Sequence, residues 1–265
     1  MANEIKIESW KMLTEFFEES KHHLHNYHAY HIQFRGQPNK EWKLSSSLQR
    51  ILIGDQLSEE KAKYYETQAQ SEFLSQAHLL KEIRTYDPSA EPVSMIVDMQ
   101  HYSCPTRLID WSGSPYIALY FAVRENPEMN GTLYIWDVRF YKKNMEALSL
   151  DSSKLKPLEI MSFNKFDFVQ LVFPTIKNQR IVSQQGCFTI SNNILKNHCD
   201  LIVEAGKKAK DHSGLYKLEI PSELKFEFLA RLRSMNISAN SLFHGPDGLG
   251  RSIHENLKLR RWSKR

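Results

Sequence analysis

The 265-residue sequence lacks the features that mark several large classes of protein. It contains only three cysteines, Cys104, Cys187 and Cys199, and none of them lies in a C-x-x-C spacing. This pattern indicates neither a disulfide framework nor a zinc site. The first residues form no apolar signal core, and no later window approaches the length of a membrane span. We therefore expect a protein of the reducing cytoplasm with no membrane partner.

Motifs of the common enzyme classes are also absent. The sequence has no glycine-rich phosphate loop of the Walker or dinucleotide-fold type, no G-x-S-x-G nucleophile elbow and no H-E-x-x-H zinc motif. A run of histidines between residues 22 and 31 has no cysteine or paired carboxylates beside it, so we expect no metal site there. No internal repeat or low-complexity linker divides the chain, which favours one domain over two.

The composition is that of a folded protein with a mild positive charge. Hydrophobic residues make up 41% and charged residues 25% of the chain, close to the average of globular domains. The formal net charge of +4 comes partly from a basic tail at residues 258–265. Such a balance permits contact with a nucleotide or a nucleic acid, although a solvated basic tail is the simpler explanation.

Residues 100–115 concentrate polar and aromatic side chains in one turn-rich segment, and an apolar run follows at residues 116–123. Prolines at 105 and 115 forbid a continuous helix through the segment, and Ser114-Pro115 predicts the start of a helix. We expect a constrained loop fixed by that helix, the kind of place where binding and catalytic groups occur. An equally open alternative is that Arg107 and Asp110 form a buried ion pair that only fixes the loop.

Two further polar clusters lie beside glycines. The alternating strand at residues 30–37 carries Arg35 next to Gly36, where the backbone can turn away while the guanidinium enters a cleft. Its fork of donors suits a phosphate or a carboxylate, and a structural arginine bonded to backbone carbonyls is the alternative. The second cluster, at residues 178–190, places Arg180 and amide side chains beside Gly186 and a following strand.

Periodicity predicts the remaining elements. We expect helices at residues 9–25, 58–86 and 221–235, a last helix after residue 251, and strands at residues 132–138, 168–174 and 214–220. Residues 140–167 are predicted to be loop plus a short helix, and residues 236–240 a turn.

The polar clusters resemble the FRG domain family. Phe34-Arg35-Gly36-Gln37 looks like the motif that names it, and residues 100–122 are similar to its central pattern, Gln-His-Tyr, Pro-Thr-Arg-Leu-Leu-Asp-Trp-Thr, Ser-Pro and Ala-Leu-Tyr-Phe-Ala. Ser103 stands where that pattern has glycine. The resemblance implies an N-terminal helix at 1–28, an FRG domain at 29–252 and a basic C-terminal helix or tail at 253–265. Kinship with phage-associated bacterial proteins also implies a role in phage conflict.

A second resemblance is to ADP-ribosyltransferases of the Arg-Ser-Glu type. Phe34-Arg35-Gly36 looks like their first strand, and Asp110-Trp111-Ser112 with residues 118–122 looks like their second element. This likeness implies an α+β single domain with a bent or split mixed β-sheet core flanked by helices. The late motif offers Gln179 or Gln184 instead of the expected glutamate. Because a carboxylate usually stabilises the oxocarbenium-like transition state, either Asp110 substitutes for it or the pocket binds without transfer.

The implied ligand is a nicotinamide dinucleotide or a related nucleotide, with NAD as a candidate substrate and no cofactor bound permanently. In the enzyme hypothesis Arg35 binds phosphate, Asp110 stabilises charge and Gln184 contacts the ribose, while His101 and Arg107 line the pocket. Further ligand contacts are expected from Gly36, Gln37, Tyr102, Thr106, Trp111, Ser112 and Arg180.

Two other hypotheses remain open. A non-catalytic module would recognise a nucleotide or a nucleic-acid end through Arg35, Arg107 and Arg180, with stacking on Trp111 or Tyr102. A purely structural polar network would only specify the fold. An enzyme should bring Arg35, Asp110 and Gln184 to one concave pocket, a nucleic-acid binder should show a continuous basic groove, and a structural network should leave no pocket.

Overall fold

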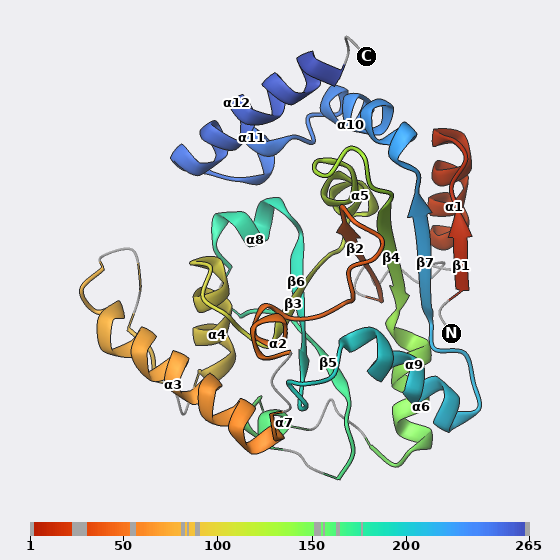
Figure 1. Cartoon of the computed structure of the whole chain (residues 1–265). Coiled ribbons are helices and arrows are strands. Elements are labelled where there is room, and N and C mark those ends of the chain that lie inside the picture. The colour runs from red at the N-terminus through yellow and green to blue at the C-terminus, as the bar shows by residue number, and fades with distance from the viewer. Residues whose placement is uncertain are drawn as a thin grey trace.

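The computed structural model of the protein describes residues 3–22, 31–53, 57–80, 83, 85–87, 91–150, 155, 157–162, 165–175 and 177–262. Within these residues one seven-stranded mixed sheet carries helices on both faces (Figure 1). The predicted mixed sheet flanked by helices is thereby confirmed, and the likeness to ADP-ribosyltransferases stays a prediction. Most of the histidine run lies outside the described residues. No described helix is both long and apolar enough to cross a bilayer.

The sheet has the strand order β1-β7-β4-β2-β3-β6-β5. Neighbouring strands are antiparallel except for β1 and β7, which run parallel. The strands are β1 (Asn3–Lys6), β2 (Ile32–Gln37), β3 (Leu108–Ser112), β4 (Gly131–Asp137), β5 (Val169–Val172), β6 (Gly186–Ser191) and β7 (Leu215–Ile220).

Each face of the sheet has its own hydrophobic core, and alternation along the central strand β4 assigns side chains to the two cores. Leu133 and Ile135 belong to one core and Tyr134 and Trp136 to the other, as the two-residue period of a strand requires. The first core takes side chains from α1 (Trp10–His22), α5 (Pro115–Val123), α10 (Lys225–Ser234) and α11 (Ala239–Leu242), with the end of α12 (Gly245–Trp262) packed against it.

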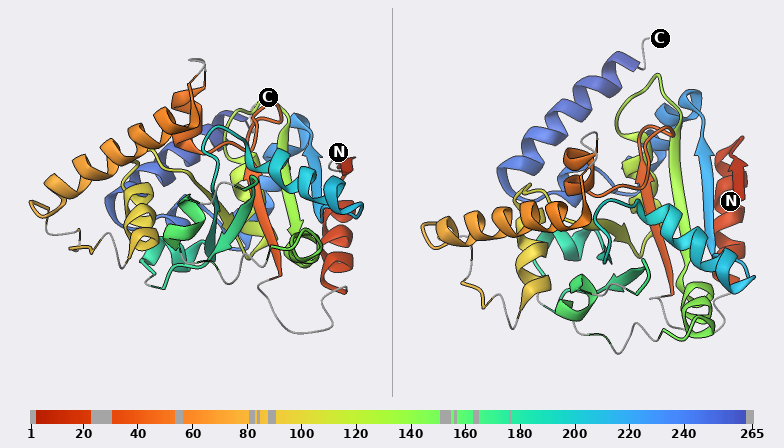
Figure 2. Two further views of the ribbon diagram at one scale, coloured as in Figure 1. Left: turned by 90° about the horizontal axis from the view of Figure 1, so that it is seen from below. Right: turned by 60° about the horizontal axis from the view of Figure 1, so that its bottom comes forward.

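The second core is covered by a different set of helices, which Figure 2 shows from two further directions. Its buried residues come from α4 (Pro92–His101), α6 (Val138–Ala147), α7 (Pro157–Ser162) and α9 (His198–Ala209), and α3 (Glu59–Ala77) packs on its edge. The short helices α2 (Ser47–Leu52) and α8 (Gln179–Ser183) lie beside the ends of strands, and a single 3-10 turn, Ser222–Leu224, precedes α10.

The strands β2 and β3 pair at one position only. Phe34 is registered with Ser112, whereas β2 pairs with β4 along its whole length and β3 does the same with β6. The sheet is therefore nearly divided between β2 and β3. Across this division the Nη1 of Arg35 donates a hydrogen bond of 2.6 Å to the backbone carbonyl of Asp110.

Gly36 continues the strand instead of ending it. β2 runs on to Gln37, where the predicted strand at residues 30–37 also ends, so the backbone does not turn away at Gly36. A Cβ atom at Gly36 would lie 1.8 Å from the carbonyl oxygen of Ala118, which belongs to α5. Because no side chain fits at that distance, the glycine is required by the close approach of α5 to β2.

Several other predicted boundaries differ from the structure. Residues 100–115 are not one loop, because β3 occupies their centre and packs Leu108, Ile109 and Trp111 into the second core.

The helix predicted to reach residue 86 ends at Ala77, and residues 140–167 contain most of α6 as well as α7. The predicted turn at 236–240 runs into α11, and α12 begins at Gly245. The sequence patterns did not predict β1 or α9.

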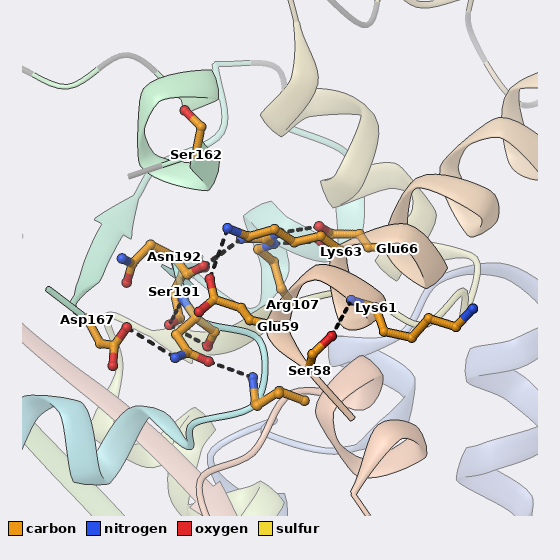
Figure 3. Close-up of polar contacts among 12 residues, drawn as sticks. Ser58, Glu59, Lys61, Lys63, Glu66, Arg107, Ser162, Asp167, Ser191 and Asn192 are labelled. Carbon is orange, nitrogen blue, oxygen red and sulfur yellow. Dashed lines mark hydrogen bonds and ion pairs between the residues drawn. The ribbon is translucent and has the colours of Figure 1, made fainter. Parts of the chain in front are cut away.

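Arg107 is a buried structural residue, and this corrects the prediction that it lines the pocket. Its side chain is 2% exposed, and its Nε donates a hydrogen bond of 2.6 Å to Oε1 of Glu66 while Nη2 pairs with the second carboxylate oxygen. Its Nη1 donates to the carbonyl of Ser191 at 2.9 Å (Figure 3). The buried ion pair thus joins Arg107 to α3 and to the end of β6, and its partner is Glu66 instead of Asp110.

Removal of the Glu66 carboxylate is expected to destabilise the fold strongly. Glu66→Ala leaves the buried Arg107 cation unpaired, which typically costs about 3–5 kcal/mol of the free energy of unfolding. Denaturant titration measures this loss. Lys63→Ala, which removes the partly exposed pair with Glu59 on the same helix, should cost less than about 1 kcal/mol. Equal small losses in both variants would contradict a structural role for the Arg107 pair.

Candidate functional site

A cavity lies where β2 and β3 diverge. This seam cavity has a volume of about 150 Å³ and brings together the three residues that the enzyme hypothesis requires in one pocket: Arg35, Asp110 and Gln184. Its complete lining is Phe34, Arg35, Gly36, Asp110, Trp111, Ser112, Ala118, Phe121, Arg180 and Gln184. The lining combines convergent polar groups with apolar side chains, which is typical of a ligand site.

An adjoining cavity of about 170 Å³ shares four residues with the seam cavity, Asp110, Trp111, Arg180 and Gln184. It extends to His101 at the end of α4. Because ligand pockets usually measure about 300–1,000 Å³, each cavity alone is small. A nucleotide-sized ligand would therefore extend through both.

The guanidinium of Arg35 makes a hydrogen bond through one nitrogen atom and leaves another without a partner. Besides its bond to the Asp110 carbonyl, Nη1 lies 3.7 Å from the Asp110 carboxylate. The Nε of Arg35 is buried and has no hydrogen-bond partner among the described residues. Burial lowers the pKa of Arg35, and the Asp110 carboxylate opposes that shift. Because this Nε is shielded, Arg35 can meet a ligand only through the part of its side chain that lines the seam cavity.

Asp110 presents its carboxylate to solvent between two arginines. Its side chain is 56% exposed, although its backbone is paired with Phe188 in the sheet. Arg35 approaches it from β2, and the charge of Asp110 also acts on Arg180 of α8. Asp110 therefore offers an accessible negative charge in a cavity where arginines supply positive charge.

Arg180 occupies the junction of the cavities. Its guanidinium lies 5.2 Å from the centre of the Phe243 ring, a cation–π distance. Burial lowers the pKa of Arg180, and the nearby Arg251 and Arg124 add to that effect. Among the described residues it forms no hydrogen bond or ion pair, so its donors are available to a ligand.

Ser112 and Gln184 connect β3 to the turn that precedes β6. The hydroxyl of Ser112 donates to the backbone carbonyl of Gln184 at 2.7 Å, and the side-chain amide of Gln184 donates to the carbonyl of Leu242 at 3.0 Å. Gln184 therefore lines the cavity with its amide nitrogen already engaged, and Ser112 acts as a positioning residue.

The structure does not bring every predicted residue to the cavities. Gln37 donates its side-chain amide to the carbonyl of Lys43, and the Thr106 hydroxyl pairs with the Gln100 side chain. Tyr102 is 41% exposed at the end of α4. None of these three residues, nor Arg107, lines either cavity.

His101 lines the adjoining cavity, and burial together with the charge of Arg180 lowers its pKa. It therefore enters the site as a neutral imidazole at neutral pH. Within the described residues, no cluster of three or more histidine, cysteine or acidic side chains could hold a metal ion.

Sequence patterns predicted Trp111, which lines both cavities, and missed Phe121, Phe243 and Ser103. Phe121 of α5 lines the seam cavity and Phe243 contacts Arg180, whereas the sequence indicated only that residues 116–123 are core. Ser103 also lines the adjoining cavity, and its backbone φ is 67°, in the left-handed region. This conformation explains the glycine of the FRG pattern at that position, because glycine adopts it without a steric cost.

A buried hydrogen-bond chain supports Trp111 behind the cavities. The indole Nε1 donates to the Thr189 hydroxyl at 3.0 Å, and that hydroxyl lies 2.8 Å from Nδ1 of His198. Burial, with the charges of Arg35 and Arg107, lowers the pKa of His198 to about 3. The imidazole is therefore neutral in the folded protein.

The buried, neutral His198 side chain predicts a loss of folding stability in mild acid. Between the unfolded pKa of 6.5 and the folded value of about 3, the unfolded state binds a proton at His198 that the folded state does not. The free energy of unfolding should therefore fall as the pH drops through this range, by up to about 1.4 kcal/mol per pH unit. Denaturant titrations of wild type and His198→Gln between pH 7 and 5 isolate this contribution. An identical pH dependence in the two proteins would contradict it.

Comparison with known protein families finds one match, which covers part of the chain. Residues 30–131 match the FRG domain. The match includes β2, β3 and α5, and therefore Arg35, Asp110 and Trp111, while Arg180 and Gln184 lie beyond it. No curated protein and no solved structure matches the chain.

Proposed function

We propose that this chain, which contains an FRG domain, binds a nicotinamide dinucleotide or a related nucleotide in the seam cavity and the adjoining cavity. The observation that carries the proposal is the convergence of Arg35, Asp110, Arg180 and Gln184 on one cavity from β2, β3 and the α8 region. They come from three stretches that lie far apart in the sequence, with Arg180 and Gln184 in the same one. Their convergence supports a ligand site more than a purely structural network.

The two arginines suit the phosphates of such a ligand. Arg35 lines the seam cavity, and Arg180 lines it too, with a guanidinium that makes no hydrogen bond among the described residues. Planar guanidinium donors bind phosphate through charge-assisted hydrogen bonds. The apolar side chains of Phe34 and Phe121 in the same lining offer a surface for an aromatic ring of the ligand.

Asp110 supplies the charge that cleavage of the glycosidic bond requires. When that bond breaks, its electron pair stays with the nicotinamide nitrogen, and the ribose carbon becomes oxocarbenium-like until water or another acceptor attacks it. A carboxylate beside this carbon lowers the barrier by several kcal/mol. The exposed carboxylate of Asp110, close to Arg35, fits this role.

Recognition without turnover is the second candidate function. The amide nitrogen of Gln184 is bonded to the Leu242 carbonyl, and Asp110 is the single acidic residue in the lining of the seam cavity within the described part of the chain. A site with that composition would bind a nucleotide, but its described lining offers no second carboxylate to assist cleavage of the glycosidic bond.

The affinity for the dinucleotide is expected to depend on Arg180. Because Arg180 makes no hydrogen bond within the described protein, Arg180→Gln tests binding with little effect on folding, whereas Arg35 also connects two strands. Loss of a charge-assisted bond costs about 1.5–3 kcal/mol, so calorimetry should show affinity reduced roughly 10- to 100-fold. Arg139→Ala, on α6 away from both cavities, is the control and should bind normally. Failure of wild type to bind would overturn the proposal.

Release of nicotinamide is expected to depend on Asp110. Asp110→Asn keeps the size of the side chain and removes its charge, so it should bind the dinucleotide within a few-fold of wild type and release nicotinamide about 100-fold more slowly. Chromatographic assay of nicotinamide measures the rate. Binding without any product in wild type would instead favour the recognition module.

A further inference from the structure

Three arginines surround the ring of Phe243, beyond the seam cavity. The guanidinium carbons of Arg124, Arg180 and Arg251 lie 5.2, 5.2 and 4.6 Å from the centre of this ring. They come from the end of α5, from α8 and from α12, so the tertiary fold brings them together. Phe243 itself is buried, and its ring provides the common contact of all three cations.

The three cations are too close to be independent. Because each guanidinium lies about 5 Å from one ring, no two of them are farther apart than roughly the 10 Å over which salt screens surface charges. Their mutual repulsion contributes to the lowered pKa of Arg180. An anion placed among them would remove this repulsion and form charge-assisted hydrogen bonds.

The carboxylates that accompany the arginines are only weak substitutes for such an anion. Glu125 pairs with Arg124 at 2.9 Å and Asp247 with Arg251 at 2.8 Å, but their side chains are 45% and 60% exposed. Exposed ion pairs contribute about 0–1 kcal/mol, so a ligand can displace them at small cost. Arg180 has no such partner within the described residues.

The cluster is open to solvent and continuous with the proposed nucleotide site. Arg180 lines the seam cavity, the adjoining cavity and a third cavity of about 430 Å³ that includes Phe243. Arg251 lines the adjoining cavity and, with Arg124, a fourth cavity of about 500 Å³ along α12. A ligand bound at Arg35 would therefore extend directly toward the three arginines.

The surrounding charges favour one localised anion over a nucleic-acid backbone. The fourth cavity is lined by Arg124, Arg251, His254 and Lys258, and also by Glu125, Asp247 and Glu255. A strand of phosphates following this cavity would meet acidic as well as basic side chains, whereas nucleic-acid grooves neutralise phosphates with lysine and arginine. The positive charge is concentrated at the Phe243 ring.

We infer that Arg124, Arg180 and Arg251 around Phe243 form a second anion subsite, which binds a phosphate monoester at the far end of the same dinucleotide. The inference rests on the proposed function, because it extends that ligand beyond the seam cavity. It specifies the substrate class: a dinucleotide that carries a phosphate in addition to its pyrophosphate. The unphosphorylated dinucleotide would occupy the seam cavity and the adjoining cavity, contact Arg180 through its pyrophosphate, and leave Arg124 and Arg251 without a phosphate.

The test compares three probes by calorimetry: nicotinamide dinucleotide, its 2′-phosphorylated form and a short single-stranded oligonucleotide. Wild type should bind the phosphorylated form at least about tenfold more tightly than the unphosphorylated one. Arg251→Gln should reduce this preference to less than about threefold, because the variant weakens binding of the phosphorylated form more than binding of the unphosphorylated one. Because Arg251 is exposed and its pair with Asp247 lies on the surface, the variant should fold normally, which thermal unfolding checks.

Arg231→Gln is the matched control. Arg231 forms the same type of i, i+4 ion pair on a helix, with Glu227 at 2.8 Å, and lies 5.5 Å from the ring of Trp10. It lines none of the four cavities, so the preference should persist in this variant.

The outcomes separate the two proposals. Equal binding of both dinucleotides, or loss of the preference in Arg231→Gln, overturns the subsite and leaves the proposed function intact. Binding of the oligonucleotide with no binding of either dinucleotide overturns the ligand class in both proposals. No binding of any probe overturns the proposed function, and the subsite with it.

Discussion

The divergence of β2 from β3 after a single paired position determines where a ligand can enter this protein. If the two strands were paired along their length, the space now occupied by the seam cavity would be filled by ladder hydrogen bonds. Instead the pairing stops at Phe34 and Ser112, and the Arg35 guanidinium crosses the gap to the Asp110 backbone. The gap is maintained from both sides, because β4 pairs with all of β2 and β6 with all of β3. Gly36 lets α5 lie directly on β2, which brings Phe121 to the cavity.

The arginines of the three polar clusters have different physical roles, and their surroundings distinguish them. Arg107 has every donor group engaged by Glu66 and by backbone carbonyls, so it has nothing to offer a ligand. Arg35 has fewer of its donors engaged than Arg107: one donates across the gap to the Asp110 carbonyl, and the buried Nε has no partner among the described residues. Arg180 is bonded to nothing among the described residues and contacts only the ring of Phe243. The capacity for ligand binding therefore increases from Arg107 to Arg35 to Arg180.

Local sequence signals predicted the helix starts, which depend on residues that are neighbours in the sequence. Helix starts were predicted at residue 58 and at Ser114-Pro115, and the side chains of Ser58 and Ser114 cap the two helices by accepting backbone hydrogen bonds. The convergence of Arg35, Asp110 and Gln184 followed from a family resemblance, since no local pattern places residues so distant in sequence in one pocket. A buried ion pair of Arg107 was one of the two alternatives that the sequence left open, but its partner was not predictable, because Glu66 is one of several acidic residues on a helix whose sequence does not indicate a buried charge. The arginine cluster around Phe243 was equally unpredictable from the sequence, because it depends on how α5, α8 and α12 pack against one another.

A crystal structure of the protein with a nicotinamide dinucleotide bound tests the central claim most directly, namely that the gap between β2 and β3 is the ligand site. The account predicts a phosphate oxygen within about 3 Å of the Arg35 or Arg180 guanidinium, a ribose beside Asp110, and strands that still diverge beyond Phe34 and Ser112. A dinucleotide bound elsewhere, in contact with neither strand, would contradict it.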